Sequence, residues 1–247
     1  MSYIYSEILK AALNDKKQLS ILIDPEKTDA ENVQSLLKNL PRETGFLFVG
    51  GSTVAPEKTE NIVTTIKKFS NLPVILFPGD HTQITEEADA ILFLSLLSGQ
   101  NPEYLIGQHV KSVSRLRQSK LEIIPTGYIL VDGGKESAVQ RVSNTLPLPQ
   151  EKVQLIVDTA LAGQFSGKKL IYLEAGSGAK FPVSGEVISV VKKAIDIPLV
   201  VGGGIRSTRQ LEKAYGAGAD MVVIGTAFEN KNFSDKISKL SVESSGI

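Results

Sequence analysis

The chemistry of the sequence centres on one carboxylate, Glu174, which follows an apolar run and precedes small residues. The segment over residues 170–178 reads L-I-Y-L-E-A-G-S-G. An ionised carboxylate with apolar neighbours needs partners or a task, and as a general base Glu174 could take a proton from a hydroxyl group. Tyr172 lies on the same side of the predicted strand and could donate a hydrogen bond to the same ligand. The structural alternative is a buried ion pair between Glu174 and a lysine or arginine.

Three glycine stretches, each placed after an apolar run, predict a phosphate site. They are Gly176-Ser177-Gly178, Gly202-Gly203-Gly204 and Gly225-Thr226. One such stretch alone indicates only a turn, since glycine serves positive φ in many loops. On three consecutive strands of a parallel barrel, however, the backbone N–H groups meet at one face and can bind an anion. We therefore expect a phosphorylated small molecule there.

A second polar cluster is expected from the ends of the first two strands. Asp24 closes the first strand, and Ser52 and Thr53 follow the second. A carboxylate with a hydroxyl or carbonyl, completed by water and substrate phosphate, is a common setting for Mg²⁺. The spacing equally allows Asp24 to cap the turn that follows it. Lys27 could pair with Asp24 or Glu26, or help to hold a diphosphate.

Three other side chains have open interpretations. Tyr104 and its apolar neighbours could line a groove for a long apolar substrate, or could pack as any helix does against a barrel. His81 and His109 lie outside the glycine loops, and we interpret both as hydrogen-bonded histidines without a catalytic task.

These residues are carried by eight apolar, strand-like runs separated by helical patterns, which is typical of buried parallel strands. The runs begin near residues 19, 46, 73, 90, 121, 170, 198 and 221. They predict an α/β fold, a single (β/α)₈ barrel domain over residues 1–247. An open doubly wound sheet would place its glycine-rich turn after the first strand, where this chain has none.

Two irregularities are expected in the barrel. Residues 78–89 leave room for only a very short or missing helix at the third helix station. The fifth strand, within residues 121–131, could be broken at Pro125 or Gly127.

The predicted helices include a leading helix over residues 1–17 and one capped by Thr28 or Asp29. Further helices are expected over residues 137–144 and 150–165. A closing helix over 233–240 and a frayed tail over 242–247 end the chain.

Composition excludes several classes of function. The 247 residues contain 27 Lys+Arg and 27 Asp+Glu, so charge gives no reason to expect a nucleic-acid partner. The absence of cysteine excludes thiolate chemistry, and two histidines are too few for a multi-histidine metal cage. The sequence shows no signal peptide and no run of the roughly 18–20 apolar residues that a spanning helix needs, so a cytoplasmic location is the expectation.

Five motifs, in order along the chain, together resemble one enzyme family. They are D-P-E-K at 24–27, V-G-G-S at 49–52, Y-L-E-A-G-S-G at 172–178, V-G-G-G-I-R-S at 201–207 and G-T-A-F-E-N at 225–230. The pattern is similar to the geranylgeranylglyceryl phosphate synthases, a family that includes the bacterial heptaprenylglyceryl phosphate synthases. The resemblance extends from about Leu19 to Asn230.

The resemblance implies a modified (β/α)₈ barrel that transfers a prenyl group from its diphosphate to the 3-hydroxyl of sn-glycerol 1-phosphate. Mg²⁺ would be the cofactor, at Asp24 and Ser52 with Thr53 as a neighbour. The glycerol phosphate would bind to residues within 172–178, 202–204 and 225–226, with Glu174 activating the hydroxyl. The implied contacts are Tyr172, Leu173, Glu174, Ala175, Gly176, Ser177, Gly178, Gly202, Gly203, Gly204, Gly225 and Thr226.

The chain departs from some family members at two positions, Leu22 and Thr226, where those members have lysine and asparagine. Both departures resemble a second subgroup that forms larger homo-oligomers, so a hexamer is favoured over a dimer. The motifs at 172–178 and 201–207 favour a geranylgeranyl donor over a heptaprenyl donor. Peripheral contact with a membrane would suit the lipid product. The alternatives are a sugar-phosphate isomerase or epimerase and a catalytically silent barrel.

Overall fold

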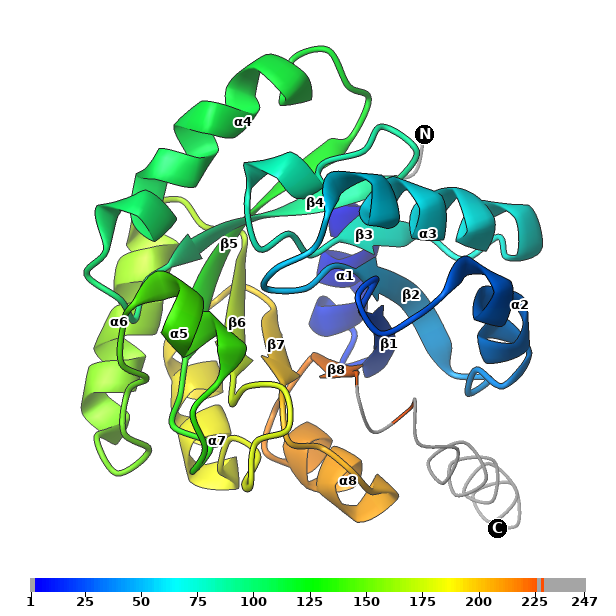
Figure 1. Ribbon diagram of the computed structural model, residues 1–247. Coiled ribbons are helices and arrows are strands. Elements are labelled where there is room, and N and C mark those ends of the chain that lie inside the picture. The colour runs from blue at the N-terminus through cyan, green and yellow to red at the C-terminus, as the bar shows by residue number, and fades with distance from the viewer. Residues whose placement is uncertain (1–2, 226–227, 229–247) are drawn as a thin grey trace, which may run out of the picture.

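In the computed structural model, which describes residues 3–225 and 228, eight parallel strands close into a barrel in chain order (Figure 1). The strands are β1 (Gln18–Ile23), β2 (Thr44–Val49), β3 (Val74–Leu76), β4 (Ala90–Leu96), β5 (Glu122–Leu130), β6 (Leu170–Glu174), β7 (Leu199–Gly202) and β8 (Met221–Ile224). The last strand pairs with the first, so no strand edge is left open. The prediction of a (β/α)₈ barrel is confirmed.

Helices surround the barrel, as Figure 1 shows. They are α1 (Ile4–Leu13), α2 (Ala30–Lys38), α3 (Pro56–Phe69), α4 (Gln108–Leu116), α5 (Ala138–Ser143), α6 (Val153–Phe165), α7 (Gly185–Ala194) and α8 (Thr208–Gly216). None of the described helices is long and apolar enough to cross a membrane. The predicted helix over 233–240 and the tail over 242–247 lie outside the described residues.

Helix ends differ in detail from the expectations. The leading helix stops at Leu13, because Asp15 adopts a left-handed φ of 53°. Asp29 precedes α2 as expected, but its side chain makes no capping hydrogen bond. Ser137 does cap α5 by accepting the N–H of Gln140. The helix expected from residue 150 begins at Val153, since the side chain of Gln150 is instead bonded to neighbouring loops.

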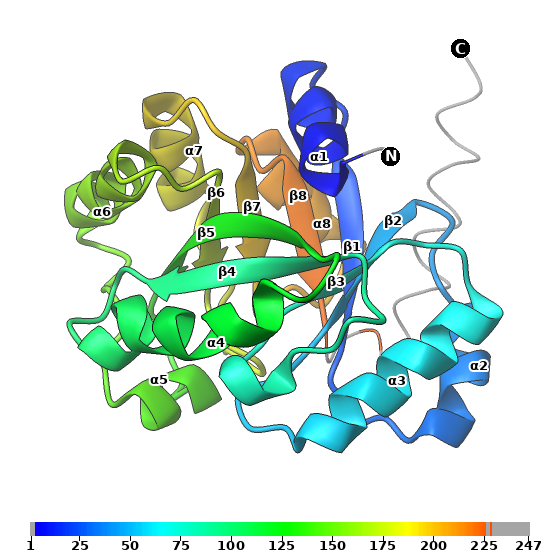
Figure 2. The ribbon, with the colours of Figure 1, turned by 90° about the horizontal axis from the view of Figure 1, so that it is seen from above.

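Alternation along the strands produces two apolar layers, because successive side chains point to opposite faces. On β6, Tyr172 belongs to the cluster inside the barrel, and Leu173 belongs to the layer between the barrel and its helices. The inner cluster also contains Ile4 and Ile8 of α1. Helix α1 therefore closes one end of the barrel, the end where the strands begin (Figure 2). The carboxylate of Glu122, at the start of β5, accepts the N–H groups of Ile4 and Tyr5 and holds α1 there.

The connection between β3 and β4, where the third helix of the barrel would stand, is irregular, as its short length predicts. A single 3₁₀ turn, η1 (His81–Gln83), replaces the helix between β3 and β4. The segment before α4 is irregular too, since η2 (Glu103–Gly107) is a π-helical turn, and such turns are frequent at functional sites. The wall of helices is thus thin around β4, which lets a cavity reach the outer face of that strand.

The expected break in β5 is wrong. The strand is continuous, and Pro125 and Gly127 both pair with β4. Pro125 is tolerated because its carbonyl accepts from Lys169, just before β6 begins pairing at Leu170. An N–H at position 125 would face residues that precede β6, so the proline costs no hydrogen bond between strands.

Candidate active site

Glu174 ends β6 at the face of the barrel where the strands finish. Its backbone pairs with Leu130 and Gly202 on the neighbouring strands, and its side chain is only 7% exposed. Oε1 accepts the N–H of Gly176 at 2.7 Å. Among the described residues no lysine or arginine pairs with Glu174, so the alternative of a buried ion pair is wrong.

Burial raises the pKa of Glu174 to about 7, although the Gly176 N–H and the nearby Tyr172 hydroxyl favour the charged form. A carboxylate tuned in this way exchanges its proton near neutral pH, which is what a general base requires. The cause is desolvation with no compensating cation, rather than repulsion by another carboxylate.

Tyr172 lies beside Glu174 and has an unused hydroxyl. Its oxygen is buried and makes no well-formed hydrogen bond to a described residue. A Cβ on Gly202 would stand 2.3 Å from this oxygen and 2.7 Å from Glu174 Oε2. Glycine at 202 therefore gives the two polar groups their space. A buried hydroxyl that has a carboxylate nearby but no well-formed hydrogen bond, at the edge of a cavity, indicates that a ligand completes the bonding.

The glycine loops pack closely around this pair. Gly203 has φ 80°, and a Cβ there would lie 2.3 Å from Glu174 Oε1 and 2.6 Å from the Gly176 nitrogen. The guanidinium of Arg206 donates to the carbonyls of Gly178 and Ala179, which joins the loop after β7 to the loop after β6. The loops thus form a fixed wall on one side of the barrel mouth.

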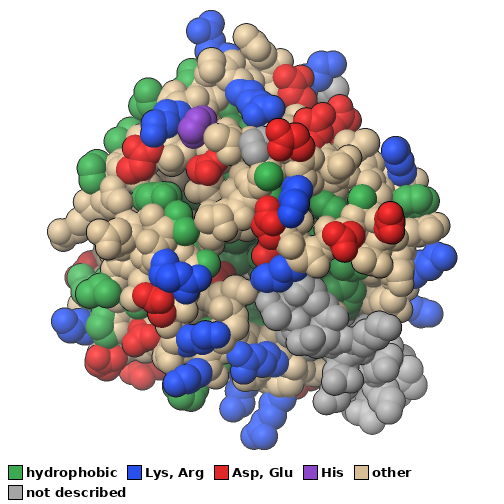
Figure 3. Space-filling view, in the orientation of Figure 1, with side chains coloured by type: hydrophobic (Ala, Val, Ile, Leu, Met, Phe, Trp, Pro, Cys, Tyr) green, Lys and Arg blue, Asp and Glu red, His purple; other side chains and the backbone are tan. Residues whose placement is uncertain are grey.

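Most of the predicted contacts line one cavity of about 940 Å³, which has room for a substantial ligand. Figure 3 shows its mouth as a hollow with charged side chains around the rim. The predicted residues that line it are Asp24, Lys27, Ser52, Thr53, Tyr104, Tyr172, Glu174, Gly176, Ser177, Gly178, Gly203, Gly204 and Gly225.

Of the predicted contacts that the structure describes, three do not line this cavity. The side chains of Leu173 and Ala175 are buried in the layer between barrel and helices, because they alternate with Tyr172 and Glu174. Gly202 is behind the Tyr172–Glu174 pair and acts by lacking a side chain. Thr226 lies outside the described residues.

Asp24 lines the same cavity as Glu174, and its two oxygens contact the turn that follows β1. Oδ1 accepts the N–H of Glu26 at 3.1 Å, so the side chain caps the turn. Oδ2 pairs with Lys27 Nζ at 2.8 Å, and the side chain remains 20% exposed to the cavity. Ser52 and Thr53 line the same region after β2. No group of three or more His, Cys, Asp or Glu that could hold a metal occurs among the described residues.

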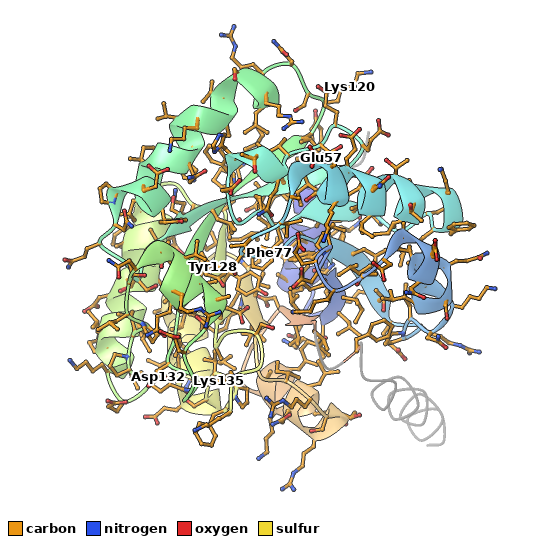
Figure 4. All side chains as sticks on the ribbon, in the orientation of Figure 1. Glu57, Phe77, Lys120, Tyr128, Asp132 and Lys135 are labelled. Carbon is orange, nitrogen blue, oxygen red and sulfur yellow. The ribbon has the colours of Figure 1, made fainter. Side chains whose placement is uncertain are left out.

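The cavity extends from this polar mouth to an apolar end at β4. Phe77 and Tyr128 also line the cavity, and their rings lie close to the Tyr172 ring, at 5.3 and 5.4 Å between centroids. Figure 4 shows Phe77 and Tyr128 near the middle of the barrel. The apolar end is lined by Ile84, Ile91, Leu92, Phe93, Leu94, Leu96, Tyr104, Val139 and Val142.

Tyr104 and the histidines occupy the walls of the apolar end. The Tyr104 hydroxyl donates to the Val142 carbonyl at 3.2 Å and so joins η2 to α5. His109 Nε2 bonds to the Leu94 carbonyl at 2.7 Å, and its ring stacks on Phe93. Burial lowers the pKa of His109, which keeps it neutral. His81 bonds to Gln108, so both histidines have partners, as expected.

The sequence reasoning did not single out Phe77, Tyr128 or Lys135. Both aromatic residues fall within predicted strands, and only the register shows that they face the cavity. Lys135 follows Gly133-Gly134 after β5, which repeats the plan of strand then glycine seen in the three predicted loops. That repetition was the available signal for Lys135.

Comparison with known proteins agrees with this geometry. "Geranylgeranylglyceryl phosphate synthase" from Zunongwangia profunda is 58% identical over 233 residues, covering 94% of this chain and all of that protein. The protein of the same name from Pyrococcus furiosus is 45% identical, covering 87% of this chain and 86% of its own length.

A solved structure is similar over nearly the whole chain. It is (S)-3-O-geranylgeranylglyceryl phosphate synthase from Thermoplasma acidophilum in complex with sn-glycerol-1-phosphate, with a TM-score of 0.88 and 35% identity. The match covers 99% of this chain and 98% of that one. Thiamine phosphate pyrophosphorylase from Pyrococcus furiosus, at 13% identity and a TM-score of 0.56, shares the fold alone. The sequence model of the PcrB family matches residues 13–243, and this chain belongs to the PcrB family.

Proposed function

We propose that this protein transfers a geranylgeranyl group from geranylgeranyl diphosphate to the 3-hydroxyl of sn-glycerol 1-phosphate and releases diphosphate. The observation that carries the proposal is the pair of Glu174 and Tyr172, which meet at the glycine loops. Among the described residues, the buried Glu174 carboxylate has no cation beside it and the buried Tyr172 hydroxyl has no well-formed hydrogen bond. The sn-glycerol-1-phosphate bound to the similar Thermoplasma acidophilum enzyme supports the same assignment.

The reaction follows from the placement of the two parts of the cavity. The glycerol phosphate binds at the glycine loops with its 3-hydroxyl at Glu174, and the prenyl chain extends to the apolar end. The C1–O bond of the prenyl diphosphate breaks, and the hydroxyl oxygen forms the new ether bond to C1. The hydroxyl proton passes to Glu174, and diphosphate leaves with the bonding electrons. Positioning matters most, because an allylic carbon carries positive charge well enough for a weak nucleophile to react.

Magnesium is part of the proposal, and the residues at the mouth fit it. Mg²⁺ commonly takes one or two carboxylates and completes its shell with water and substrate phosphates. Asp24 offers a carboxylate that faces the cavity, with Ser52 and Thr53 beside it. When bound there, the ion would neutralise the departing diphosphate. Lys27 already occupies one oxygen of Asp24, so it is placed to contribute to the same charge balance.

The apolar end supports a long donor. Its side chains come from the inner and outer faces of β4, from η2 and α5, and from Ile84 directly after η1. Burying a prenyl chain contributes about 0.8 kcal/mol per CH₂ group, so donor length should change affinity strongly. Heptaprenyl or another donor length is the alternative within the same reaction. Assembly as a hexamer and contact of the lipid product with a membrane stay predictions.

The test is a transfer assay with radiolabelled sn-glycerol 1-phosphate and Mg²⁺. Farnesyl, geranylgeranyl and longer prenyl diphosphates are compared as donors, with sn-glycerol 3-phosphate as the control acceptor. Label that becomes organic-extractable with the 1-phosphate and best with the geranylgeranyl donor is the expected result. Folded protein that transfers no label to any donor would refute the proposal, and a better longer donor would correct the chain length.

A further inference from the structure

We propose that Lys135, in the loop after β5, is the cationic contact for the phosphate group of the acceptor. This inference deepens the proposed function and rests on it for the identity of the acceptor. Figure 4 shows Lys135 in the loop that follows β5, and its side chain lines the same cavity as Glu174 and the glycine loops.

The position of Lys135 is the first argument. Its Nζ lies 3.8 Å from the point where a Cβ on Gly178 would stand, which is ordinary contact distance. Gly178 belongs to the loop whose backbone is expected to hold the phosphate. A flexible ammonium group at that distance can reach an anion bound to the loop and donate to it.

The use of the other cations is the second argument. Within the described part of the chain, three further lysine or arginine side chains line the cavity, and each has a partner. Lys27 pairs with Asp24, Arg141 pairs with Glu136, and Arg206 donates to the carbonyls of the loop after β6. Lys135 has no ion pair with any described residue. It is therefore the cation that is free to neutralise a ligand charge at this wall.

On the side of β1, an apolar side chain borders the phosphate region instead of a charged one. Opposite the β8 loop stands Leu22, whose side chain lies 3.6 Å from the Cβ position of Gly225. The first strand therefore gives a phosphate no counter-charge there. Glu174, the carboxylate at the end of β6, is used for the hydroxyl and supplies no positive charge to the phosphate. A dianion bound between these groups needs a cation from elsewhere, and the loop after β5 provides one.

The test measures binding and turnover separately. Isothermal titration of the full chain with sn-glycerol 1-phosphate, without donor, gives the acceptor Kd. Lys135→Met removes the charge but keeps most of the stem, and we expect Kd to rise about ten- to hundredfold. Lys135→Arg should recover part of the affinity. Binding to the variant should also depend less on salt, since one screened charge pair has been removed.

Lys180→Met is the matched control. Lys180 is an exposed lysine in the loop after β6, it does not line the cavity, and only its backbone is bonded to Gly133. Its replacement should leave Kd unchanged. Steady-state kinetics then provide a second readout, in which Lys135→Met should raise the KM for the acceptor but not the KM for the prenyl diphosphate.

The outcomes separate this inference from the proposed function. An unchanged acceptor Kd in Lys135→Met, or a KM effect confined to the prenyl diphosphate, overturns the inference while the transfer reaction stands. If the wild-type protein transfers no label, the acceptor titration and a parallel one with inorganic phosphate still report on Lys135. Loss of both affinities in Lys135→Met would then support the contact, and failure of the wild-type protein to bind either anion would overturn it.

Discussion

The two walls of the cavity mouth hold their carboxylates in opposite ways. On the β6–β8 wall, Glu174 is buried, has no cation from the described residues beside it and has a pKa raised to about 7. On the β1–β2 wall, Asp24 pairs with Lys27 and Glu26 pairs with Lys58, and these side chains are partly exposed. The hydrogen bonds from Lys58 and from the Ala55 N–H lower the pKa of Glu26.

This difference assigns different chemistry to the two walls. A desolvated carboxylate without a cation can take up a proton. A partly exposed carboxylate beside a lysine can instead attract a metal ion, and the lysine and the ion can balance a diphosphate. Proton transfer therefore belongs to the β6–β8 wall, and charge neutralisation belongs to the β1–β2 wall. Substitutions that change one wall at a time test this division.

The largest expected effect is that of Glu174→Gln. The amide keeps the size of the side chain but cannot accept the proton, so kcat should fall by roughly 10²–10⁴-fold. The transfer assay measures this, with circular dichroism to confirm that the barrel is folded. Glu151→Gln, an exposed carboxylate that does not line the cavity, is the control and should keep full activity. Comparable turnover in both variants would remove Glu174 from the mechanism.

Asp24→Asn should give the next largest effect. The amide is a poorer ligand for Mg²⁺ than a carboxylate, so more Mg²⁺ should be needed for half-maximal activity and kcat should fall by about a hundredfold. The measurement is a Mg²⁺ titration of the transfer assay.

The control for Asp24→Asn is Lys27→Met, because the first substitution also releases Lys27 from its ion pair. We expect Lys27→Met to change the Mg²⁺ requirement much less. If both variants behave alike, the effect at position 24 comes from the lost ion pair, and the assignment of a metal to Asp24 is wrong.

Tyr172→Phe tests the other polar group of the β6–β8 wall and should cost about tenfold in kcat/KM, as one hydrogen bond to the ligand is lost. The Tyr172 hydroxyl also lowers the pKa of Glu174. Without it that pKa should rise further, so the acidic limb of the pH–rate profile should move to higher pH. A tenfold loss with an unmoved profile would mean that the hydroxyl contacts the ligand but does not influence the carboxylate.

The sequence was sufficient to predict the barrel, because buried parallel strands are nearly continuous apolar runs. It also predicted that Glu174 and Asp24 lie at the barrel mouth, because both carboxylates end such runs. The short connection between β3 and β4 was predicted from the number of residues between the two strands alone. The register was harder to predict. Leu173 and Ala175 were predicted as contacts along with Tyr172, but alternation turns their side chains into the outer layer. Pro125 was expected to break β5, yet its missing N–H falls where β6 has not begun.

The use of the cations could be predicted from the sequence only in part. Lys27 was expected to pair with Asp24 or Glu26, and it pairs with Asp24. The contact of Arg206 with the carbonyls of the β6 loop depends on loop geometry, which no pattern of residue types specifies. The same holds for the absence of a cation beside Glu174. The raised pKa of Glu174 is therefore a property of the folded structure, and it has a consequence for stability that is independent of catalysis.

The smallest expected effect is on the pH dependence of unfolding. An unfolded chain ionises Glu174 near its ordinary pKa of 4.5, whereas the folded chain keeps the proton up to about pH 7. Between these values the unfolded state binds fewer protons than the folded state, so raising the pH lowers stability, and the loss levels off above pH 7. Glu174→Gln has no such proton to lose. Thermal unfolding of both proteins from pH 5 to pH 8 should show the wild type losing a few °C relative to the variant. Parallel curves would mean that Glu174 has an ordinary pKa, and the contrast between the two walls would then rest on geometry alone.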